Sequence, residues 1–427
     1  MQVALVIGIQ SSGISACALL QKKGYEVRRY DDNLDFEGNF KGREEEVFEN
    51  LNLIIISPGI PNSHKIVVEA KKRGMPIISE LELGARELTC PFVMITGTNG
   101  KTTTVDMVAR GLRAMGKKVK AMGNIGYPVS QVILDGTELD IAVIEASSFQ
   151  LEYTHSLKPK VSAFLNIAPD HIDRYDNYSQ YILAKKRVFL NQTESDFAVL
   201  NYDSKIVAES AVRAKPLFVS TREKVGAFYM KDNYFYYQNE PLVSAKDFKL
   251  KGEHNKFNLL TALNIMAVFG AKREHCISLI REYKLLPHRI EYVSTISGKA
   301  FYNDSKGTNI SACKQAIDTV KGKNVGLILG GSDKQEEFCE FFDEVSEYVK
   351  FIAVTGGNDE KIYASAMKVG FSNIKICKSL SDAVKLLHSM PEIETVLFSP
   401  ASASFDRYSS YIERGNSFKE LVYALEN

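Results

Sequence analysis

The sequence lacks the features that mark several large classes of protein. Its formal net charge is only +1 over 427 residues, so there is no basic excess to hold a nucleic-acid backbone or an anionic membrane. No apolar run approaches the roughly 20 residues that a helix needs to cross a bilayer. We therefore expect a cytoplasmic protein with no nucleic-acid partner and no membrane insertion.

Cysteine is scarce and scattered. The six cysteines stand singly, and none forms a C-x-x-C pair. This spacing fits neither a metal site nor a disulfide framework, so we expect small buried thiols in a reducing compartment. The first thirteen residues also lack a basic segment, and their apolar run stops at a glycine turn. They indicate a first β-strand rather than a signal peptide.

What is present is a recurring unit of a short apolar strand, a glycine-containing turn and a helix. This alternation indicates parallel α/β sheets, and the length suits about three domains of roughly 150 residues. We expect α/β domains at residues 1–89, 90–287 and 288–427. The expected strands are residues 3–7, 25–30, 53–56, 76–78, 91–96, 141–145, 161–167, 197–201, 300–303, 325–329, 351–354 and 395–399. The expected helices include residues 14–23 and 255–269, and a β-rich stretch covers residues 226–250.

The strongest motif is TGTNGKTT at residues 96–103, between an apolar strand and a helix with an apolar face. Glycines let backbone N–H groups turn toward phosphates, and the helix N-terminus adds partial positive charge. Lys101 would neutralise the β- and γ-phosphates of ATP, and the Thr102 hydroxyl would bind Mg²⁺. The loop is a shortened form, because Ile95 stands where the first glycine of G-x-x-x-x-G-K-[ST] belongs. The alternative is a glycine turn that caps an ordinary helix. The expected nucleotide contacts are Gly97, Thr98, Asn99, Gly100, Lys101, Thr102 and Thr103.

Acidic residues stand at the ends of two strands that are successive in the sequence. Glu145 ends the strand at residues 141–145, where a carboxylate beside a phosphate loop is placed to hold Mg²⁺; a helix cap or edge acid is the alternative. Asp170, His171 and Asp173 follow the strand at 161–167 in the same way. A single histidine is more often structural, but beside a metal site His171 becomes a candidate ligand or proton-transfer group.

A second glycine turn lies near the N-terminus. Residues 8–13, GIQSSG, connect a strand to a helix, and Asp31 and Asp32 follow the second strand. This is close to the dinucleotide-binding fingerprint, but Gln10 replaces the middle glycine that lets the backbone approach a pyrophosphate. An NAD-dependent oxidoreductase therefore remains an alternative that depends on this turn alone.

Further motifs, taken in order and spacing, resemble the Mur ligase family. They are GNIG (123–126), EASSFQLE (145–152), LNIAPDHIDRY (165–175), Y-x-x-A-K (181–185), GEHNKFN (252–258), LPHRIE (286–291), YNDSKGTN (302–309) and SPASASFD (399–406). The SSFQLE and SPASASFD forms most resemble the branch that adds D-glutamate. The resemblance covers all three expected domains.

The resemblance implies a function and a fold. The chain would be an ATP-dependent ligase that joins D-glutamate to UDP-N-acetylmuramoyl-L-alanine through an acyl-phosphate, for peptidoglycan precursors, with ATP and Mg²⁺ as cofactors. We expect a monomer with a Rossmann-like N-terminal domain, a central ATPase domain of the P-loop type and a Rossmann-like C-terminal domain. The third domain would close near residues 287–289 and exclude water from the acyl-phosphate.

The resemblance also assigns residues. Lys185 matches the lysine that this family carbamylates, and a carbamate offers Mg²⁺ an oxygen ligand; without the family, residues 185–187 would be interpreted as a solvated helix face. Arg289 would reach a nucleotide phosphate. The adenine and ribose contacts would be Asn255, Asn258 and Asp304. The metal ligands would be Thr102, Glu145, His171 and Lys185, and the catalytic residues Lys101, Glu145, His171 and Lys185. The UDP contacts would be Ser11, Ser12, Gly13, Asp31, Asp32, Ser57 and Gly59, with Asn124 and His171 at the muramoyl group. The D-glutamate contacts would be Thr308, Lys334, Ser404, Phe405 and Tyr411.

Three other functions remain as alternatives. A sister ligase could add L-alanine, a diamino acid or a dipeptide, although the D-N-P-R motif of the diamino-acid type is absent from the sequence. A folate polyglutamate ligase would lack a uridine-binding first domain. A non-catalytic nucleotide switch would bind ATP without turnover.

Overall fold

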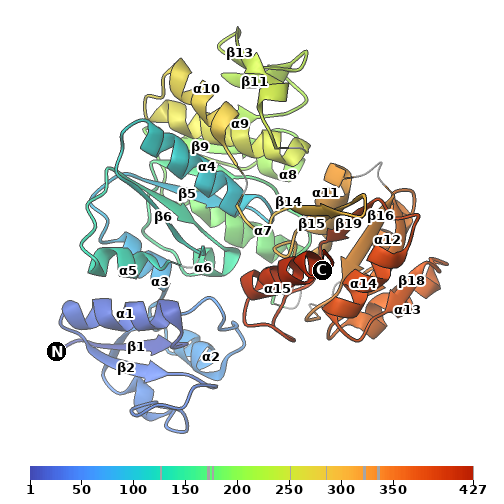
Figure 1. Ribbon diagram of the computed structural model, residues 1–427. Coiled ribbons are helices and arrows are strands. Elements are labelled where there is room, and N and C mark those ends of the chain that lie inside the picture. The colour runs from blue at the N-terminus through green and yellow to red at the C-terminus, as the bar shows by residue number, and fades with distance from the viewer. Residues whose placement is uncertain are drawn as a thin grey trace. The chain divides into compact units, whose positions relative to one another are not determined.

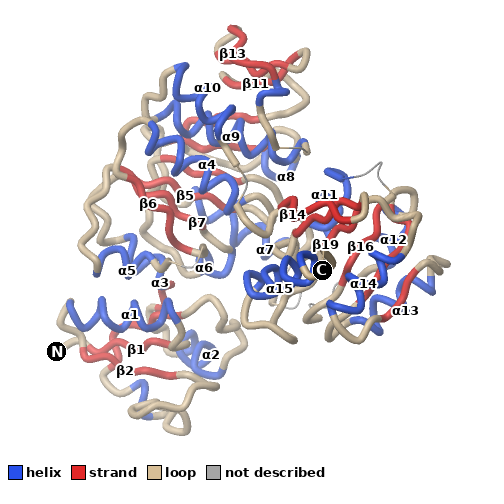
Figure 2. The backbone as a smooth tube through the Cα atoms, in the orientation of Figure 1, coloured by secondary structure: helices blue, strands red, loops and turns tan. Residues whose placement is uncertain are grey.

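The computed structural model describes residues 1–125, 127–170, 174–175, 177–250, 252–284, 286–320, 324–333 and 337–426. The chain forms two compact units. The first holds Met1–Ile167, Arg174–Lys249 and Asn255–Tyr283, and the second holds Ala168–Asp173, Leu250–His254 and Lys284–Asn427. Strands and helices alternate in both units (Figures 1 and 2). In the described ranges, no helix has the length and apolar character to pass through a bilayer.

The N-terminal sheet has the strand order β2-β1-β3-β4, and all its pairs are parallel. Its strands are β1 (Val3–Ile7), β2 (Glu26–Tyr30), β3 (Leu51–Ile56) and β4 (Ile77–Ser79). Helices α1 (Ser11–Lys22) and α3 (Glu80–Ala85) pack on one face, and α2 (Lys65–Lys72) packs on the other. Both faces are therefore apolar, as in other parallel sheets.

Helix α1 begins earlier than the sequence indicates. The predicted helix starts at residue 14, whereas α1 starts at Ser11. Ser11, Ser12 and Gly13 are therefore the first helical turn and not part of a loop. The helix comes very close to the preceding turn, because a Cβ atom at Gly13 would lie 1.9 Å from the Gly8 carbonyl oxygen.

The central sheet has the order β10-β9-β8-β5-β7-β6 and is also parallel. Its strands are β5 (Phe92–Thr96), β6 (Val119–Gly123), β7 (Ile141–Glu145), β8 (Val161–Phe164), β9 (Phe197–Asn201) and β10 (Lys215–Val219). After β5 the chain forms β6 at one edge of the sheet and then β7 between β6 and β5. It then forms β8, β9 and β10 on the other side of β5. The loops after β5, β7 and β8 therefore meet at the carboxyl edge, where α/β sheets bind ligands.

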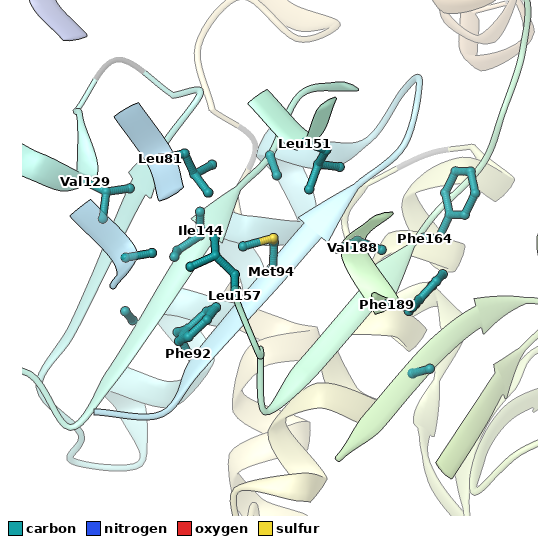
Figure 3. Close-up of a cluster of buried hydrophobic side chains, with 14 of the residues drawn as sticks. Leu81, Phe92, Met94, Val129, Ile144, Leu151, Leu157, Phe164, Val188 and Phe189 are labelled. Carbon is teal, nitrogen blue, oxygen red and sulfur yellow. The ribbon is translucent and has the colours of Figure 1, made fainter. Parts of the chain in front are cut away.

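Helices surround this sheet and extend its core. They are α4 (Lys101–Ala114), α5 (Val129–Leu134), α6 (Ser148–Glu152), α7 (Tyr178–Lys186), α8 (Lys205–Ala208), α9 (Glu253–Val268), α10 (Arg273–Glu282) and the short 3₁₀ helix η2 (Arg187–Phe189). Two further 3₁₀ helices lie elsewhere: η1 (Glu46–Phe48) precedes β3 and packs in the core of the N-terminal sheet, and η3 (Ala245–Asp247) precedes α9. Figure 3 shows Leu81 of α3 in the same buried cluster as Met94 of β5, Ile144 of β7 and Phe164 of β8. Helix α3, which follows the N-terminal sheet, thus contributes side chains to the core of the central sheet.

The predicted β-rich stretch forms a small antiparallel sheet in the order β11-β12-β13. Its strands are β11 (Phe228–Lys231), β12 (Tyr234–Tyr237) and β13 (Glu240–Ser244). Aromatic side chains are paired across it, since the Tyr229 and Tyr236 rings stack at 5.1 Å between centroids.

The second unit is built on the sheet β14-β15-β19-β16-β17-β18, which is parallel except at β14. Its strands are β14 (Glu291–Ile296), β15 (Lys299–Asn303), β16 (Val325–Leu329), β17 (Val349–Val354), β18 (Ile374–Ile376) and β19 (Thr395–Phe398). Its helices are α11 (Ile310–Val320), α12 (Cys339–Val345), α13 (Asp359–Lys368), α14 (Leu380–Ser389) and α15 (Tyr411–Tyr423). Helices α11 to α13 cover one face, and α14 and α15 cover the other.

Candidate active site

The phosphate loop connects β5 to α4 at the centre of the first unit's large sheet. Lys101 is the first residue of α4, and Gly100 precedes it with a left-handed φ of 82°. A Cβ atom at Gly100 would lie 2.6 Å from the Asn258 side-chain oxygen. Glycine is therefore required here twice, once by the backbone angle and once by the close approach of α9. Asn258, expected from the resemblance to contact adenine, lies beside the loop.

Asn166, in the loop after β8, fixes the shape of the phosphate loop. Its side-chain oxygen accepts a hydrogen bond from the Asn99 N–H at 2.8 Å, and its amide donates to the Asn99 carbonyl at 3.0 Å. Its own carbonyl accepts from the Thr98 N–H at 3.0 Å. The sequence analysis did not single out Asn166, although it lies inside the LNIAPDHIDRY motif.

Two lysines converge on one carbonyl oxygen of the loop. The Lys101 ammonium donates to Gly97 O at 2.9 Å and to Thr98 O at 2.8 Å. The Lys185 ammonium, from α7, donates to the same Gly97 O at 2.8 Å. Lys185 is only 2% exposed, so the interpretation of this position as a solvated helix face is wrong. One turn earlier, the Tyr181 hydroxyl lies 3.1 Å from the Thr98 hydroxyl.

Glu145 is positioned to hold a cation. It is the last residue of β7, next to β5, and is 2% exposed. One carboxylate oxygen accepts from the Asn124 side-chain amide at 2.9 Å. The other is buried and meets no hydrogen-bond donor among the residues that the structure describes. A buried carboxylate oxygen left in this state is costly unless a cation neutralises it, so the site fits Mg²⁺. The predicted ligand Thr102 is buried in the first turn of α4, directly after the phosphate loop.

Two predicted site residues, His171 and Lys334, lie outside the described residues. Asp170, six residues after the end of β8, belongs to the second unit. Its carboxylate accepts a hydrogen bond from the Asn309 side chain at 3.0 Å. The predicted strand at 161–167 is shorter than expected, since β8 ends at Phe164.

At the N-terminal sheet, the predicted UDP residues gather at the carboxyl ends of β1, β2 and β3. The Asp31 carboxylate accepts the Ile9 N–H at 2.7 Å, and it also accepts the N–H groups of Asn33 and Leu34. Burial alone would raise the pKa of Asp31, but these donors more than offset that effect and lower it. The Ser57 hydroxyl donates to the Gly8 carbonyl at 2.7 Å. Asp31 and Ser57 therefore shape the turn, whereas Gly59 is exposed.

Asp304 lies at the end of β15 in the second unit and is buried. Its two carboxylate oxygens accept from the Ser399 hydroxyl at 2.6 Å and from the Ile290 N–H at 3.2 Å. Burial raises the pKa of Asp304 to about 7, and the Ser399 hydrogen bond and the charge of Arg289 offset only part of that rise. A Cβ atom at Gly307 would lie 2.3 Å from this carboxylate, so glycine is required beside it.

The predicted D-glutamate residues of the second unit differ in exposure. Ser404 is buried, whereas the Phe405 side chain is 76% exposed and Thr308 is partly exposed. Tyr411 begins α15, and the Lys306 ammonium donates to its hydroxyl at 3.1 Å. The Lys306 ammonium also lies 4.6 Å from the centroid of that ring.

Arg414 connects the two segments that carry these residues, and the sequence analysis missed it. Its buried guanidinium donates to the carbonyls of Ser305, Ser402 and Ala403 and to the Ser305 hydroxyl. The available signal was Gly415, a glycine inside a helical pattern, which often marks a close approach. A Cβ atom at Gly415 would lie 2.2 Å from the His288 ring.

The buried Asp304 predicts a pH effect on stability. Between about pH 3.8 and 7, the folded chain keeps the Asp304 proton while the unfolded chain releases it, so the free energy of unfolding falls as pH rises through this window. Urea unfolding of wild type and Asp304→Asn at pH 4.5 and 7.5 checks this. The asparagine side chain cannot ionise, so the free energy of unfolding of the variant should fall less between pH 4.5 and 7.5 than that of wild type. An equal fall in both proteins would contradict a raised pKa at Asp304.

Arg414→Ala should lower the free energy of unfolding by about 3 kcal/mol or more, because it leaves several buried acceptors without a donor. Arg414→Lys should recover only part of the loss, since an ammonium lacks the planar fork that reaches both segments. The exposed Arg407 provides the control, and Arg407→Ala should cost less than about 1 kcal/mol. Urea unfolding followed by circular dichroism measures all three, and a neutral Arg414→Ala would show that the guanidinium does not hold these segments.

Comparison with known proteins gives the family. Residues 95–266 match the Mur ligase middle domain, and residues 288–402 match the Mur ligase, glutamate ligase domain. The UDP-N-acetylmuramoylalanine--D-glutamate ligase of Caldanaerobacter subterraneus subsp. tengcongensis is 37% identical over 440 residues, covering 98% of each chain. The protein of the same name from Bacillus cereus (strain G9842) is 38% identical over 439 residues, covering 99% of this chain and 97% of its own.

Solved structures share the fold. The pseudomurein peptide ligase type C of Methanothermus fervidus superposes with a TM-score of 0.65 at 17% identity, covering 100% of both chains. The MurF ligase of Thermotoga maritima in complex with ADP has a TM-score of 0.63 at 17% identity, covering 93% of this chain and 95% of its own. The two domain matches and the relatives of nearly equal length show that this chain belongs to the Mur ligase family.

Proposed function

We propose that this chain joins D-glutamate to UDP-N-acetylmuramoyl-L-alanine by an amide bond, at the expense of ATP and through an acyl-phosphate, in the synthesis of peptidoglycan precursors. The observation that carries this proposal is the agreement, along nearly the whole chain, with relatives that bear the name of that ligase. A phosphate loop with two converging lysines supports it independently.

The chemical difficulty is the approach of two anions. A substrate carboxylate must attack the γ-phosphate of ATP, and like charges repel. Lys101 cancels phosphate charge from within the loop, and the α4 N-terminus adds to it. A bound Mg²⁺ would neutralise further phosphate charge. The residues that would hold it are Thr102, Glu145, Lys185 as a carbamate, and His171. Asn255, Asn258, Arg289 and Asp304 would contact the nucleotide.

The position of Lys185 supports its carbamylation. Two ammonium groups that donate to Gly97 O repel each other at short range. A carbamate on Lys185 reverses its charge, which turns that repulsion into attraction to Lys101 and provides oxygen ligands for a metal. The unsatisfied oxygen of Glu145 would then share the cation.

The two organic substrates are assigned to the outer domains. UDP would occupy the carboxyl ends of β1 to β3, near Ser12, Asp32 and Gly59, with Asn124 at the muramoyl group. D-glutamate would contact the third domain. The proposed contacts there are Thr308, Lys334, Ser404, Phe405 and Tyr411. We infer a cytoplasmic monomer with domains at residues 1–89, 90–287 and 288–427.

An amino-acid panel tests the function. With ATP, Mg²⁺ and UDP-N-acetylmuramoyl-L-alanine present, D-glutamate should support phosphate release, whereas L-alanine, L-glutamate and diamino acids should not. Lys101→Ala should lower kcat by about 10²-fold or more, the scale of one electrostatic donor. Lys117→Ala, a lysine exposed beyond the end of α4, is the matched control. Turnover with another amino acid, or normal turnover of Lys101→Ala, would refute the proposal.

The carbamate has its own test. Lys185→Ala should be nearly inactive, and acetate or formate should restore part of kcat by occupying the vacated space as an oxygen ligand. Lys186→Ala, one residue along α7, should keep full activity without rescue. Full activity of Lys185→Ala would remove Lys185 from the site, and an inactive variant that no short carboxylate rescues would argue against the carbamate.

A further inference from the structure

A cavity of about 1030 Å³ lies within the first unit. The starts of β3 and β4 form one wall, and α7 with η2 forms the other. The lining residues include none of those assigned to ATP, metal, UDP or D-glutamate. The apolar part of the lining includes Leu53, Met75, Ile77, Tyr153, Leu183 and Leu190. The volume is close to the upper end of the range for sites that bind small organic molecules, and such sites are lined mainly by apolar side chains.

Two leucines on the wall formed by α7 and η2 are unusually exposed to solvent. Leu183 is 63% exposed and Leu190 is 51% exposed. Isolated exposed leucines are common on proteins, but two on one wall of a large cavity form an apolar surface that a ligand would remove from water.

The polar part of the lining is mostly cationic. Lys71, Arg86, Lys186 and Arg187 contribute to it, against one carboxylate, Glu152. Arg86 is paired with Glu82 at 2.8 Å, and Arg187 donates to backbone carbonyls. Glu152 accepts from the Asn62 amide at 2.8 Å.

Lys186 differs from the other cations. Its side chain makes no ion pair and no hydrogen bond with the described residues, although it lines the cavity from α7. Its ammonium is therefore available to a ligand anion, next to the exposed leucines.

The cavity and the phosphate loop contact opposite sides of α7. Tyr181 and Lys185, four residues apart, lie on the side that bonds Thr98 and Gly97. Leu183 and Lys186, three residues apart, line the cavity. At 100° per residue these pairs point in roughly opposite directions. A ligand that shifts α7 would therefore move Lys185 relative to the loop.

We propose that this cavity is an effector site for a small amphiphilic anion, with an apolar body against Leu183 and Leu190 and a carboxylate or phosphate at Lys186. Its occupancy changes turnover through α7. This goes beyond the proposed reaction, because none of the assigned substrate contacts lies in the cavity. Binding can be measured without catalysis, so failure of this proposal is distinguishable from failure of the proposed function.

The binding test uses the fluorescent probe 8-anilinonaphthalene-1-sulfonate, titrated with ATP and Mg²⁺ present so that the nucleotide site is filled. Leu183→Glu and Lys186→Glu should each weaken probe binding by about tenfold or more, since each places a like charge beside the anion. Ile206→Glu, which changes an exposed isoleucine outside the cavity lining, should leave binding unchanged. Probe binding equal to wild type in both cavity variants would overturn the site.

Competition and kinetics complete the test. Decanoate and decyl phosphate should displace the probe, and their relative strength identifies the preferred head group; decanol should not displace it. Displacement by decanol as effective as by the anions would overturn the role of Lys186. The stronger anion should change kcat at least twofold in wild type and not in Leu183→Glu. Binding that leaves kcat unchanged would overturn the coupling through α7.

Discussion

The candidate active site depends on one backbone carbonyl, that of Gly97. It accepts hydrogen bonds from Lys101 of α4 and Lys185 of α7, so two helices and a loop are fixed at one point. Two ammonium groups that share one acceptor oxygen repel each other at short range, so neighbouring contacts must hold this arrangement in place. The Asn166 side chain is one such contact, because its oxygen accepts from the Asn99 N–H and its amide donates to the Asn99 carbonyl.

Sheet topology explains why these groups meet. Strand β5 lies between β7 and β8, and the chain reverses its direction across the sheet at that point. The phosphate loop, Glu145 and Asn166 follow these three strands and must share one edge. The N-terminal sheet repeats the rule on a smaller scale, because the Gly8 turn, Asp31 and Ser57 follow β1, β2 and β3. The parallel order of the strands therefore positions the expected nucleotide and metal residues in the central sheet and the expected UDP residues in the N-terminal sheet.

The sequence predicted the central strands well because they are buried on both faces and form continuous apolar runs. It missed β6, β10, β14 and β18, which are all edge strands with polar residues in their sequences. The residues of the candidate site also differ in how well the sequence predicts them. Motif residues such as Lys101 and Glu145 were predictable, and the family resemblance supplied Lys185. Arg414 was harder to predict, because its guanidinium joins carbonyls 11 and 12 residues away to a segment more than a hundred positions away, and Gly415 was the one local signal.

Helix α3 has a consequence for how the chain folds and diversifies. Leu81 and Ala85 pack into the central core, while Leu83 packs under the first sheet. The Glu80 carboxylate also accepts the Ser130 N–H at 2.6 Å. The N-terminal sheet is thus separate in topology but not in packing, and the two sheets should melt as one cooperative body. Recombination that exchanges this sheet between relatives must carry α3 with it, or the recipient core is left with a gap.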